Sequence, residues 1–328
     1  MLVLLRILLL LSSDIESNPG PSVSDVSSVS SCSSNFTTLF DDAKYTFVHL
    51  NVQSIKHKFD ILFSELYKIN ILSFTETWLS PNEIISDSEF PGFSSPYCYC
   101  RPHRQGGGVS VYVSNSITSK RRSDLELPSV ECVWVQLNIL GKLVLYGTFY
   151  RPPDEPVSSW DHIAHSIELA FNTGIPNIII TGDFNANLLN NNNNHSIHLR
   201  NLLTTYNLTQ SVANPTFFTE SSSSLLDIVC ASDPSLVNLC HVGESFLDQP
   251  IRYHCPVYGS LNISKPIQSC FKRNILLYDL GDYDDYRDKL SKIDWDSILD
   301  NNNIDRYTDL LTDIILKTAR ECIPNKTK

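Results

Sequence analysis

The stretch that decides the fold reads Ile178-Ile179-Ile180-Thr181-Gly182-Asp183-Phe184-Asn185-Ala186-Asn187. Three β-branched residues in succession predict a strand that is covered on both faces, and the glycine ends the apolar run. In open α/β sheets, ligands bind at the carboxyl ends of the strands. We therefore expect Asp183 and Asn185 to lie at a functional edge of a sheet.

Asp183 and Asn185 are two positions apart, so an extended backbone would point both side chains the same way. The carboxylate can accept a proton and the carboxamide can donate hydrogen bonds to an anion, a pairing that suits hydrolysis of a phosphate ester. The alternative interpretation is a plain turn, because glycine, aspartate and asparagine are all favoured in turns. The stretch alone leaves both interpretations open.

The composition allows one large domain with appendages or two ordinary domains, since 42% of the 328 residues are hydrophobic. The net charge of −11 argues against a non-specific DNA coat, but not against a nuclease whose cations offset its carboxylates. The nine cysteines include no C-x-x-C pair and leave one unpaired in any complete disulfide scheme. Reduced thiols in an intracellular protein are therefore expected, with Cys98 and Cys100 as strand residues rather than ligands.

The chain begins with a leucine-rich run, residues 1–11, that is too short for the ~20 residues of a membrane span. Residues 14–21 read D-I-E-S-N-P-G-P and fill every fixed position of the pattern D-x-E-x-N-P-G-P. The match resembles the ending of viral and retroelement 2A-type ribosome-skipping peptides. The resemblance implies that the bond between Gly20 and Pro21 is never made and that the mature chain starts at Pro21.

Secretory routing remains the alternative for the same segment, because a leucine-rich start also fits the apolar core of a signal peptide. Three formal glycosylation triplets, at Asn35, Asn207 and Asn262, agree with it, although such triplets arise easily in a chain rich in asparagine and serine. Residues 22–43 contain a serine-rich tract and are expected to form a disordered linker.

Periodicity predicts alternating strands and helices from Tyr45 onward. The Gly106-Gly107-Gly108 run predicts a tight turn before a strand rather than a phosphate loop, because no G-K-[ST] follows. Residues 190–194 predict a surface loop or a helix start. The predicted strands are 45–51, 71–78, 109–113, 225–230 and one that opens at 254. A predicted hairpin joins 131–140 to 142–150 over Gly141. The predicted helices are 59–66, 160–171 and a C-terminal tail with Ile304, Tyr307, Leu311, Ile314, Ala319 and Cys322 on one face.

The ends of the predicted strands supply polar residues in a fixed order: Asn51, Glu76, Tyr150, Asp183 with Asn185, Asp227 and His254. This order resembles the endonuclease/exonuclease/phosphatase superfamily, which includes apurinic endonucleases and pancreatic-type deoxyribonuclease. Four segments are similar to the apurinic-type endonuclease domain of LINE-type non-LTR retrotransposons, namely 75–79 (TETWL), 106–109 (GGGV), 150–153 (YRPP) and 226–229 (LDIV). The resemblance spans about residues 45–261.

The resemblance implies an α/β fold, a two-sheet α/β sandwich flanked by helices. The domains would be a skipping peptide (1–21), a linker (22–43), the endonuclease (44–262) and a helical linker toward a reverse transcriptase (263–328). The implied activity is nicking of a DNA phosphodiester in the nucleus with Mg²⁺ or Mn²⁺, leaving a 3′-hydroxyl that primes reverse transcription. Retroelement RNA and the reverse transcriptase would be further partners.

The resemblance also assigns roles to the strand-end residues. Glu76 would hold Mg²⁺, a hard cation that prefers oxygen ligands, with support from Asn51. Asp183 would be the base for water, while Asn185 and His254 would donate to the phosphate as charge builds. Tyr150 would hydrogen-bond the phosphate. Asp227 would orient neighbouring side chains.

Two positions depart from the family pattern. Gln53 stands where many relatives carry an acidic residue, so metal binding would lean on Glu76. Tyr253 stands where the family usually has the aspartate that orients the histidine, which predicts a weak nuclease that Tyr253→Asp improves. A decayed, inactive retroelement fragment and another superfamily phosphoesterase therefore remain as alternatives.

Overall fold

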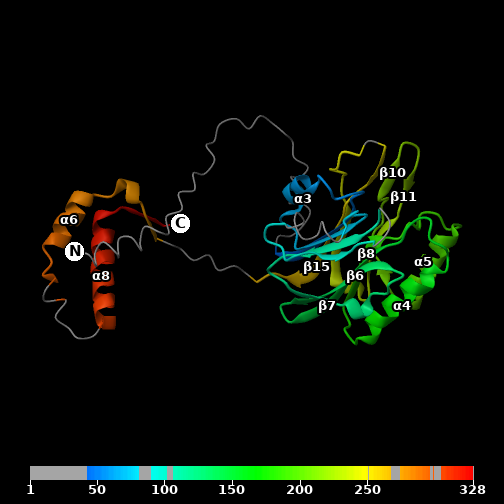
Figure 1. Ribbon diagram of the computed structural model, residues 1–328, viewed down its shortest axis with the longest axis horizontal. Helices are drawn as coiled ribbons and strands as arrows, with labels where there is room; N and C mark the ends of the chain where they lie inside the picture. The colour runs from blue at the N-terminus through cyan, green and yellow to red at the C-terminus, as the bar shows by residue number, and fades with distance from the viewer. Residues whose placement is uncertain are drawn as a thin grey trace. The chain divides into compact units, whose positions relative to one another are not determined.

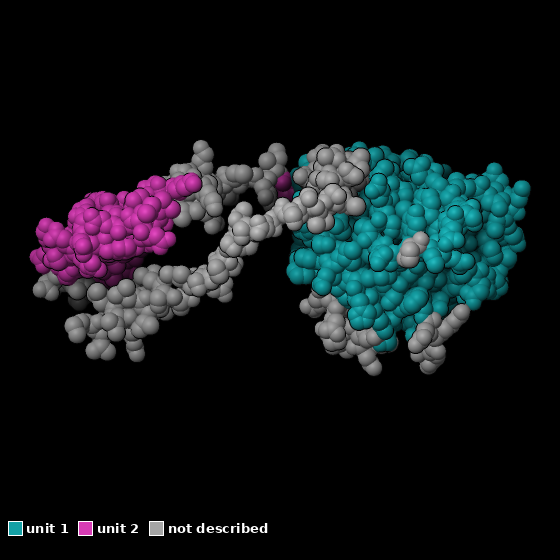
Figure 2. Space-filling view, turned by 90° about the horizontal axis from the view of Figure 1, so that it is seen from above, with its two compact units in different colours: residues 1–265 teal, residues 266–328 magenta. Residues whose placement is uncertain are grey.

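The computed structural model describes residues 43–80, 90–101, 106–249, 251–266, 274–295, 298 and 304–327. The chain divides into two compact units, residues 1–265 and 266–328, which are teal and magenta in Figure 2. The leucine-rich run, the D-x-E-x-N-P-G-P motif and the serine-rich tract of the sequence lie outside the described residues.

The first unit contains two six-stranded sheets, and the first of them has the strand order β13-β15-β1-β2-β4-β3. In this sheet β1 and β2 run parallel, whereas every other neighbouring pair is antiparallel. Its strands are β1 (Lys44–Asn51), β2 (Ile71–Thr75), β3 (Tyr97–Tyr99), β4 (Val109–Val113), β13 (Val237–Val242) and β15 (Val257–Ser264). Cys98 lies in β3 as expected, whereas Cys100 comes just after the end of that strand.

The second sheet has the order β5-β6-β7-β8-β12-β9, with only β7 and β8 parallel. Its strands are β5 (Thr118–Arg121), β6 (Glu131–Ile139), β7 (Lys142–Tyr150), β8 (Ile178–Asp183), β9 (Thr209–Gln210) and β12 (Asp227–Ala231). The predicted hairpin between β6 and β7 is confirmed. Leu140 and Gly141 form its turn with φ values of 53° and 85°, and positive φ at both positions suits the twist of the strands.

Two hydrophobic cores explain why the central strands are apolar on both faces. In β1, Phe47 belongs to the core that lies between the sheets, whereas its neighbour Val48 belongs to the core beneath α3. Side chains alternate between the two faces of a strand, so one strand supplies both cores. The predicted two-sheet α/β sandwich is confirmed.

Helices cover the outer faces of the sandwich, with α3 on one side and α4 and α5 on the other (Figure 1). They are α3 (Phe59–Leu66), α4 (Ser159–Asn172) and α5 (Asn194–Thr205), and short 3₁₀ turns lie at η1 (Ser123–Leu125) and η2 (Pro234–Leu236). The asparagine run is the start of α5, where the Asn193 side chain accepts hydrogen bonds from the N–H groups of His195 and Ser196.

A third, small sheet carries His254 and was not predicted. It consists of β10 (Phe217–Thr219), β11 (Ser223–Ser224) and β14 (Arg252–His254), in the order β11-β10-β14. The single strand predicted to open at His254 is wrong, because His254 ends β14 and β15 begins only at Val257. Pro256 stands between them, and a proline has no N–H to offer a sheet ladder.

Two further strand boundaries differ from the prediction. The predicted strand 71–78 stops at Thr75, because Glu76 and Trp78 have φ values of 51° and 56° in the left-handed region. The strand predicted from Leu225 begins at Asp227. Glu76 therefore lies just beyond the end of β2, and Asp227 is the first residue of β12.

The second unit contains the predicted helical tail. Its elements are β16 (Asn274–Leu276), η3 (Tyr278–Leu280), α6 (Tyr283–Ser291), α8 (Ile304–Cys322) and β17 (Asn325–Thr327). Lys289 joins the two helices, since its Nζ lies 3.0 Å from Asp285 and 3.3 Å from Glu321. Across the described parts of both units, no helix is both long and apolar enough to cross a membrane.

Candidate active site

Pairing between strands brings the predicted side chains to one edge of the sandwich. Asn51 pairs with Thr75, the residue before Glu76, in the parallel β1–β2 ladder. Asp183 pairs with Tyr150 on one side and with Asp227 on the other. His254 comes from the small sheet, so three sheets contribute to one cluster of polar residues: Asn51, Glu76, Tyr150, Asp183, Asp227 and His254.

Asn51 links the two large sheets at this edge. Its Nδ2 donates to Glu76 Oε1 at 2.8 Å and to Asp183 Oδ2 at 2.8 Å. Its Oδ1 accepts a hydrogen bond from the N–H of Gln53 at 3.1 Å. Asn51 is fully buried. Its amide therefore fixes the relative position of two carboxylates, one that follows β2 and one that ends β8.

Gly182 sets the position of Asp183. The φ of Gly182 is 155°, and a Cβ atom there would lie 2.1 Å from the carbonyl oxygen of Phe149. Only glycine lets β8 run this close to β7, which leaves Asp183 at the strand end with 1% of its surface exposed. The glycine that ended the apolar run in the sequence is thus required by packing.

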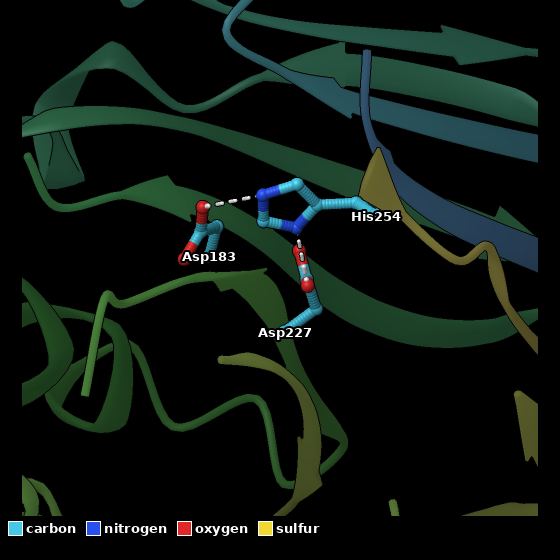
Figure 3. A group of neighbouring side chains, drawn as sticks. All are labelled: Asp183, Asp227 and His254. Atoms are coloured by element: carbon cyan, nitrogen blue, oxygen red, sulfur yellow. Dashed lines mark hydrogen bonds and ion pairs between the residues drawn. The ribbon is translucent and has the colours of Figure 1, made fainter. Parts of the chain in front are cut away.

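His254 lies between two carboxylates (Figure 3). Its Nδ1 donates to Asp227 Oδ2 at 2.8 Å, and its Nε2 lies 4.0 Å from Asp183 Oδ2. Asp227 and His254 are both buried. The geometry gives the imidazole one fixed partner and points its other nitrogen at Asp183.

Burial and charge separate the pKa values of these three groups. Burial, and then the charge of Asp227, raises the pKa of Asp183 to about 7. Burial would also raise the pKa of Asp227, but the charges and hydrogen bonds of His254 and His49 hold it well below its usual range. Burial would lower the pKa of His254, but Asp227, Asp183 and Glu76 raise it to about 9. At neutral pH, Asp227 is therefore an anion beside a cationic His254.

The expectation that His254 lacks an orienting carboxylate is wrong. Asp227 supplies that carboxylate, as the hydrogen bond to Nδ1 shows. Tyr253 points to the other face of β14, where its ring stacks on Phe218 with centroids 5.4 Å apart. The sequence interpretation predicted a weakened nuclease because it gave the role of orienting His254 to the neighbouring residue, Tyr253.

Glu76 and Tyr150 are the remaining members of the cluster. Glu76 is half-buried, and the indole N–H of Trp78 donates to its Oε2 at 3.3 Å. Burial, followed by the charges of Glu76 and Asp183, raises the pKa of Tyr150 far above its usual value. Tyr150 therefore remains a phenol that can donate a hydrogen bond.

Asn185 is close to Asp183, but not on the predicted extended backbone. Its φ is 48°, and its N–H donates to Asp183 Oδ1 at 2.9 Å in a tight turn. Its Nδ2 donates to the carbonyl of Arg151 at 3.0 Å. The two interpretations of the stretch are thus compatible, since the turn itself holds Asp183 in place.

Two residues at the site were missed in the sequence. His49 is fully buried and its Nε2 lies 3.2 Å from Asp227 Oδ1. Its only sequence signal is its place two residues before Asn51, on the same face of β1. Trp78 lies beside Glu76 with 43% of its surface exposed. Its sequence signal is its place in the TETWL segment.

Two groups of residues can be considered for a metal ion. Asp183, Asp227 and His254 each offer a ligand atom, all within 4.8 Å of one another, and could hold one. However, His254 Nδ1 is bonded to Asp227, and a protonated imidazole is not a ligand. The predicted pair, Asn51 and Glu76, offers only oxygen ligands, with Glu76 partly exposed, and this donor set fits a hard divalent cation.

Comparisons with known proteins identify the family and the fold. The profile of the endonuclease/exonuclease/phosphatase family matches residues 48–247. No curated protein matches the chain. The endonuclease domain of TRAS1, a telomere-specific non-LTR retrotransposon, has a TM-score of 0.55 and 16% identity over 67% of this chain and 100% of that one. The 3′ phosphatase NExo from Neisseria, bound to a product DNA hairpin, has a TM-score of 0.48 and 15% identity over 67% and 100% of the respective chains. At these identities the likeness to TRAS1 shows a shared fold.

Proposed function

The chain belongs to the endonuclease/exonuclease/phosphatase family, and from that premise we propose that it is a metal-dependent DNA endonuclease of a non-LTR retrotransposon. The reaction is hydrolysis of one phosphodiester, which leaves a 3′-hydroxyl that primes reverse transcription. The observation that carries the proposal is the approach of His254 Nε2 to Asp183 Oδ2 at 4.0 Å. A base and a cationic donor this close can act on the same phosphodiester.

Asp183 is the base that orients and deprotonates the attacking water. Its pKa of about 7 lies near neutral pH, where a general base is most effective. The N–H of Asn185 and the amide of Asn51 each donate to one of its oxygens and hold the carboxylate plane. Asp183 therefore enters the reaction already oriented.

His254 stabilises the charge that builds on the phosphate. Its Nδ1–H is committed to Asp227, so its protonated Nε2 is the donor available to a phosphate oxygen. Tyr150 contributes a phenol hydrogen, and Asn185 contributes the amide hydrogen that Arg151 does not occupy. These donors lie around Asp183, where a bound phosphate would be attacked.

Glu76 and Asn51 are the residues that would hold Mg²⁺ or Mn²⁺. Bound there, the cation would supply positive charge against the phosphate oxygens. Asn51 would support the site by holding Glu76, since its Nδ2 donates to Glu76 Oε1. Gln53, also near Asn51, offers a neutral carboxamide and adds no charge to the site.

DNA and a retrotransposon origin are supported by sequence and fold together. The segments 75–79, 106–109, 150–153 and 226–229 resemble LINE-type endonuclease domains, and three of them contain or adjoin the site residues Glu76, Tyr150 and Asp227. The TRAS1 endonuclease domain shares the fold. Retroelement RNA and a reverse transcriptase are the proposed further partners, and the nucleus is the proposed place of action.

Nicking of supercoiled plasmid by the full-length chain with Mg²⁺ tests the proposal. We expect open-circular product that a DNA polymerase can extend directly, since the nick leaves a 3′-hydroxyl. Chelation of the metal should abolish it, and Asp183→Ala prepared identically controls for contaminating nucleases. Hydrolysis of inositol phosphates or phosphomonoesters, without nicking of DNA, would overturn the proposal.

We further propose that translation skips the bond between Gly20 and Pro21, because residues 14–21 fill every fixed position of the 2A-type motif. Residues 1–21 placed between two reporters in a cell-free lysate should give two separate products. Pro21→Ala should restore one fused product. A fused product from the unchanged sequence would refute the proposal.

A further inference from the structure

We propose that His49 is a positioning residue, which holds Asp227 so that Asp227 in turn fixes the imidazole of His254. The inference rests on the proposed function for its effect on catalysis, but its geometric part can be tested without any reaction. His49 is not among the site residues predicted from the sequence, and no role was predicted for it.

The carboxylate of Asp227 is held at both ends. Oδ1 lies 3.2 Å from His49 Nε2, and Oδ2 lies 2.8 Å from His254 Nδ1. All three side chains are buried, with His49 and Asp227 at 0% exposure. Because each oxygen has its own imidazole partner, rotation of the carboxylate would break both hydrogen bonds together.

His49 lies on β1 and is completely buried. Its Nε2 faces an ionised carboxylate and therefore carries the hydrogen, while its Nδ1 lies 3.5 Å from Ser73 Oγ. Ser73 on β2 donates to the carbonyl of Val48 at 2.8 Å and contacts the hydroxyl of Tyr146 at 3.1 Å. The buried His49 ring thus presents its Nε2 hydrogen to a carboxylate on the second sheet.

Apart from His49 and His254, the described residues that bond to Asp227 reach its backbone and not its carboxylate. Its N–H, like that of Leu226, donates to Thr216 Oγ1, at 3.0 Å and 3.1 Å respectively. Nothing in that contact sets the carboxylate plane. His49 supplies the missing constraint, and it does so from β1, whose last residue is Asn51. One strand therefore positions both buried carboxylates of the site, Asp183 through Asn51 and Asp227 through His49.

Two conservative variants separate positioning from packing. In His49→Gln, the side-chain N–H group lies the same number of bonds from the backbone as Nε2, so it can still reach Asp227. In His49→Asn, the N–H group is one bond shorter and cannot. We expect His49→Asn to lower the single-turnover nicking rate by about 10- to 100-fold, the usual effect of losing such an outer partner, and His49→Gln to remain within a few fold of the parent.

Thr148→Val is the matched control. Thr148 on β7 shares a buried hydrogen bond of 3.2 Å with Thr181 on the neighbouring strand β8, and valine keeps its shape while removing that bond. We expect the thermal stability of this variant to fall while its nicking rate stays unchanged. A rate loss in Thr148→Val equal to that in His49→Asn would show that any damage to the inter-sheet core slows the enzyme.

The readout that needs no catalysis is the Nδ1–H resonance of His254 in the metal-free, histidine-labelled chain, assigned by its loss in His254→Asn. We expect the resonance to shift or broaden in His49→Asn and to remain in place in His49→Gln and Thr148→Val. If the parent does not nick DNA but this pattern holds, the proposed function fails and the positioning of Asp227 stands. An unchanged resonance in a folded His49→Asn, or equal nicking by the two His49 variants, would overturn the inference.

Discussion

Asp183 and Asp227 face each other as a cross-strand pair, yet their surroundings make them chemically different. Both are buried, at 1% and 0% exposure. The donors around Asp183 are amides, whereas those around Asp227 are two imidazoles. The pKa of Asp183 is accordingly raised by burial to about 7, while the histidines outweigh burial and lower the pKa of Asp227.

The difference between the pKa values of Asp183 and Asp227 shows which carboxylate can act as a base. Two neighbouring titratable groups whose pKa values are pushed apart by their environments point to separate catalytic roles. Asp183 can take up a proton near neutral pH, whereas Asp227 stays charged and keeps His254 protonated.

The largest expected effect is that of Asp183→Asn. An amide cannot accept the proton of water, so the nicking rate should fall by about 10² to 10⁴, the contribution typical of a general base. Single-turnover nicking at saturating DNA and Mg²⁺ measures it, and circular dichroism checks the fold. Near-parental nicking by a folded Asp183→Asn would show that another residue is the base.

Glu76→Gln should have the next largest effect, because it removes the charged ligand while keeping the shape. We expect the Mg²⁺ concentration for half-maximal nicking to rise by about tenfold or more, since Mg²⁺ is held by few protein carboxylates. Much of the rate should return at high Mg²⁺. The matched comparison is Asp183→Asn, whose lost rate no Mg²⁺ concentration should restore. If Glu76→Gln shows the parental Mg²⁺ dependence, the metal lies elsewhere, and the group formed by Asp183, Asp227 and His254 becomes the alternative.

The strand-end residues were predictable because the rule behind them is local. An apolar run followed by a polar residue marks a strand end, and the parallel pairs β1–β2 and β7–β8 bring such ends together. Asp227 differs, because it begins an antiparallel strand. His49 was not predictable, since its partner Asp227 is 178 positions away and a histidine in an apolar strand gives no signal of what it faces. The left-handed turn at Asn185 was also hidden, because its hydrogen bond to Arg151 depends on a neighbouring strand.

Stability against pH tests the same contrast without any substrate. The folded pKa of Asp183 is raised to about 7, so the stability associated with its protonated form is full below about pH 4 and is lost as the pH rises through about 7. The amide introduced by Asp183→Asn cannot ionise, so this variant, free of metal, should gain stability over the parent as the pH rises from about 5 to about 8.5. The Tm of Asp183→Asn should rise by several degrees relative to the parent over this pH range, because each kcal/mol of unfolding free energy shifts Tm by roughly 2–4 °C in a domain of this size.

Asp227→Asn should behave in the opposite way. The folded pKa of Asp227 is lowered, so its stabilising charge is present above about pH 4 and is lost only as the pH falls through the folded value. The variant should therefore melt below the parent throughout the range from about pH 5 to about pH 8. Thermal melts of both variants at matched pH check this, and curves that move in the same direction would remove the contrast between the two carboxylates.

The smallest expected effect on catalysis is that of Tyr253→Asp, which the sequence alone predicted to be an improvement. His254 Nδ1 is already bonded to Asp227, and Tyr253 faces away from it into a cavity of about 650 Å³ that Phe218 also lines. A carboxylate at position 253 would therefore meet Phe218 rather than His254. The nicking rate should stay within about threefold of the parent, a difference of less than roughly 1 kcal/mol in the barrier.

The Tm of Tyr253→Asp should fall by a few degrees. Loss of the stacked aromatic pair removes about 0.5–1.5 kcal/mol of stability, beyond the stability lost because the ring no longer buries its area. Tyr253→Phe keeps the stack and serves as the control, with parental rate and stability. A tenfold faster Tyr253→Asp would mean that Asp227 alone does not orient His254, and that the contrast between the two buried carboxylates is incomplete.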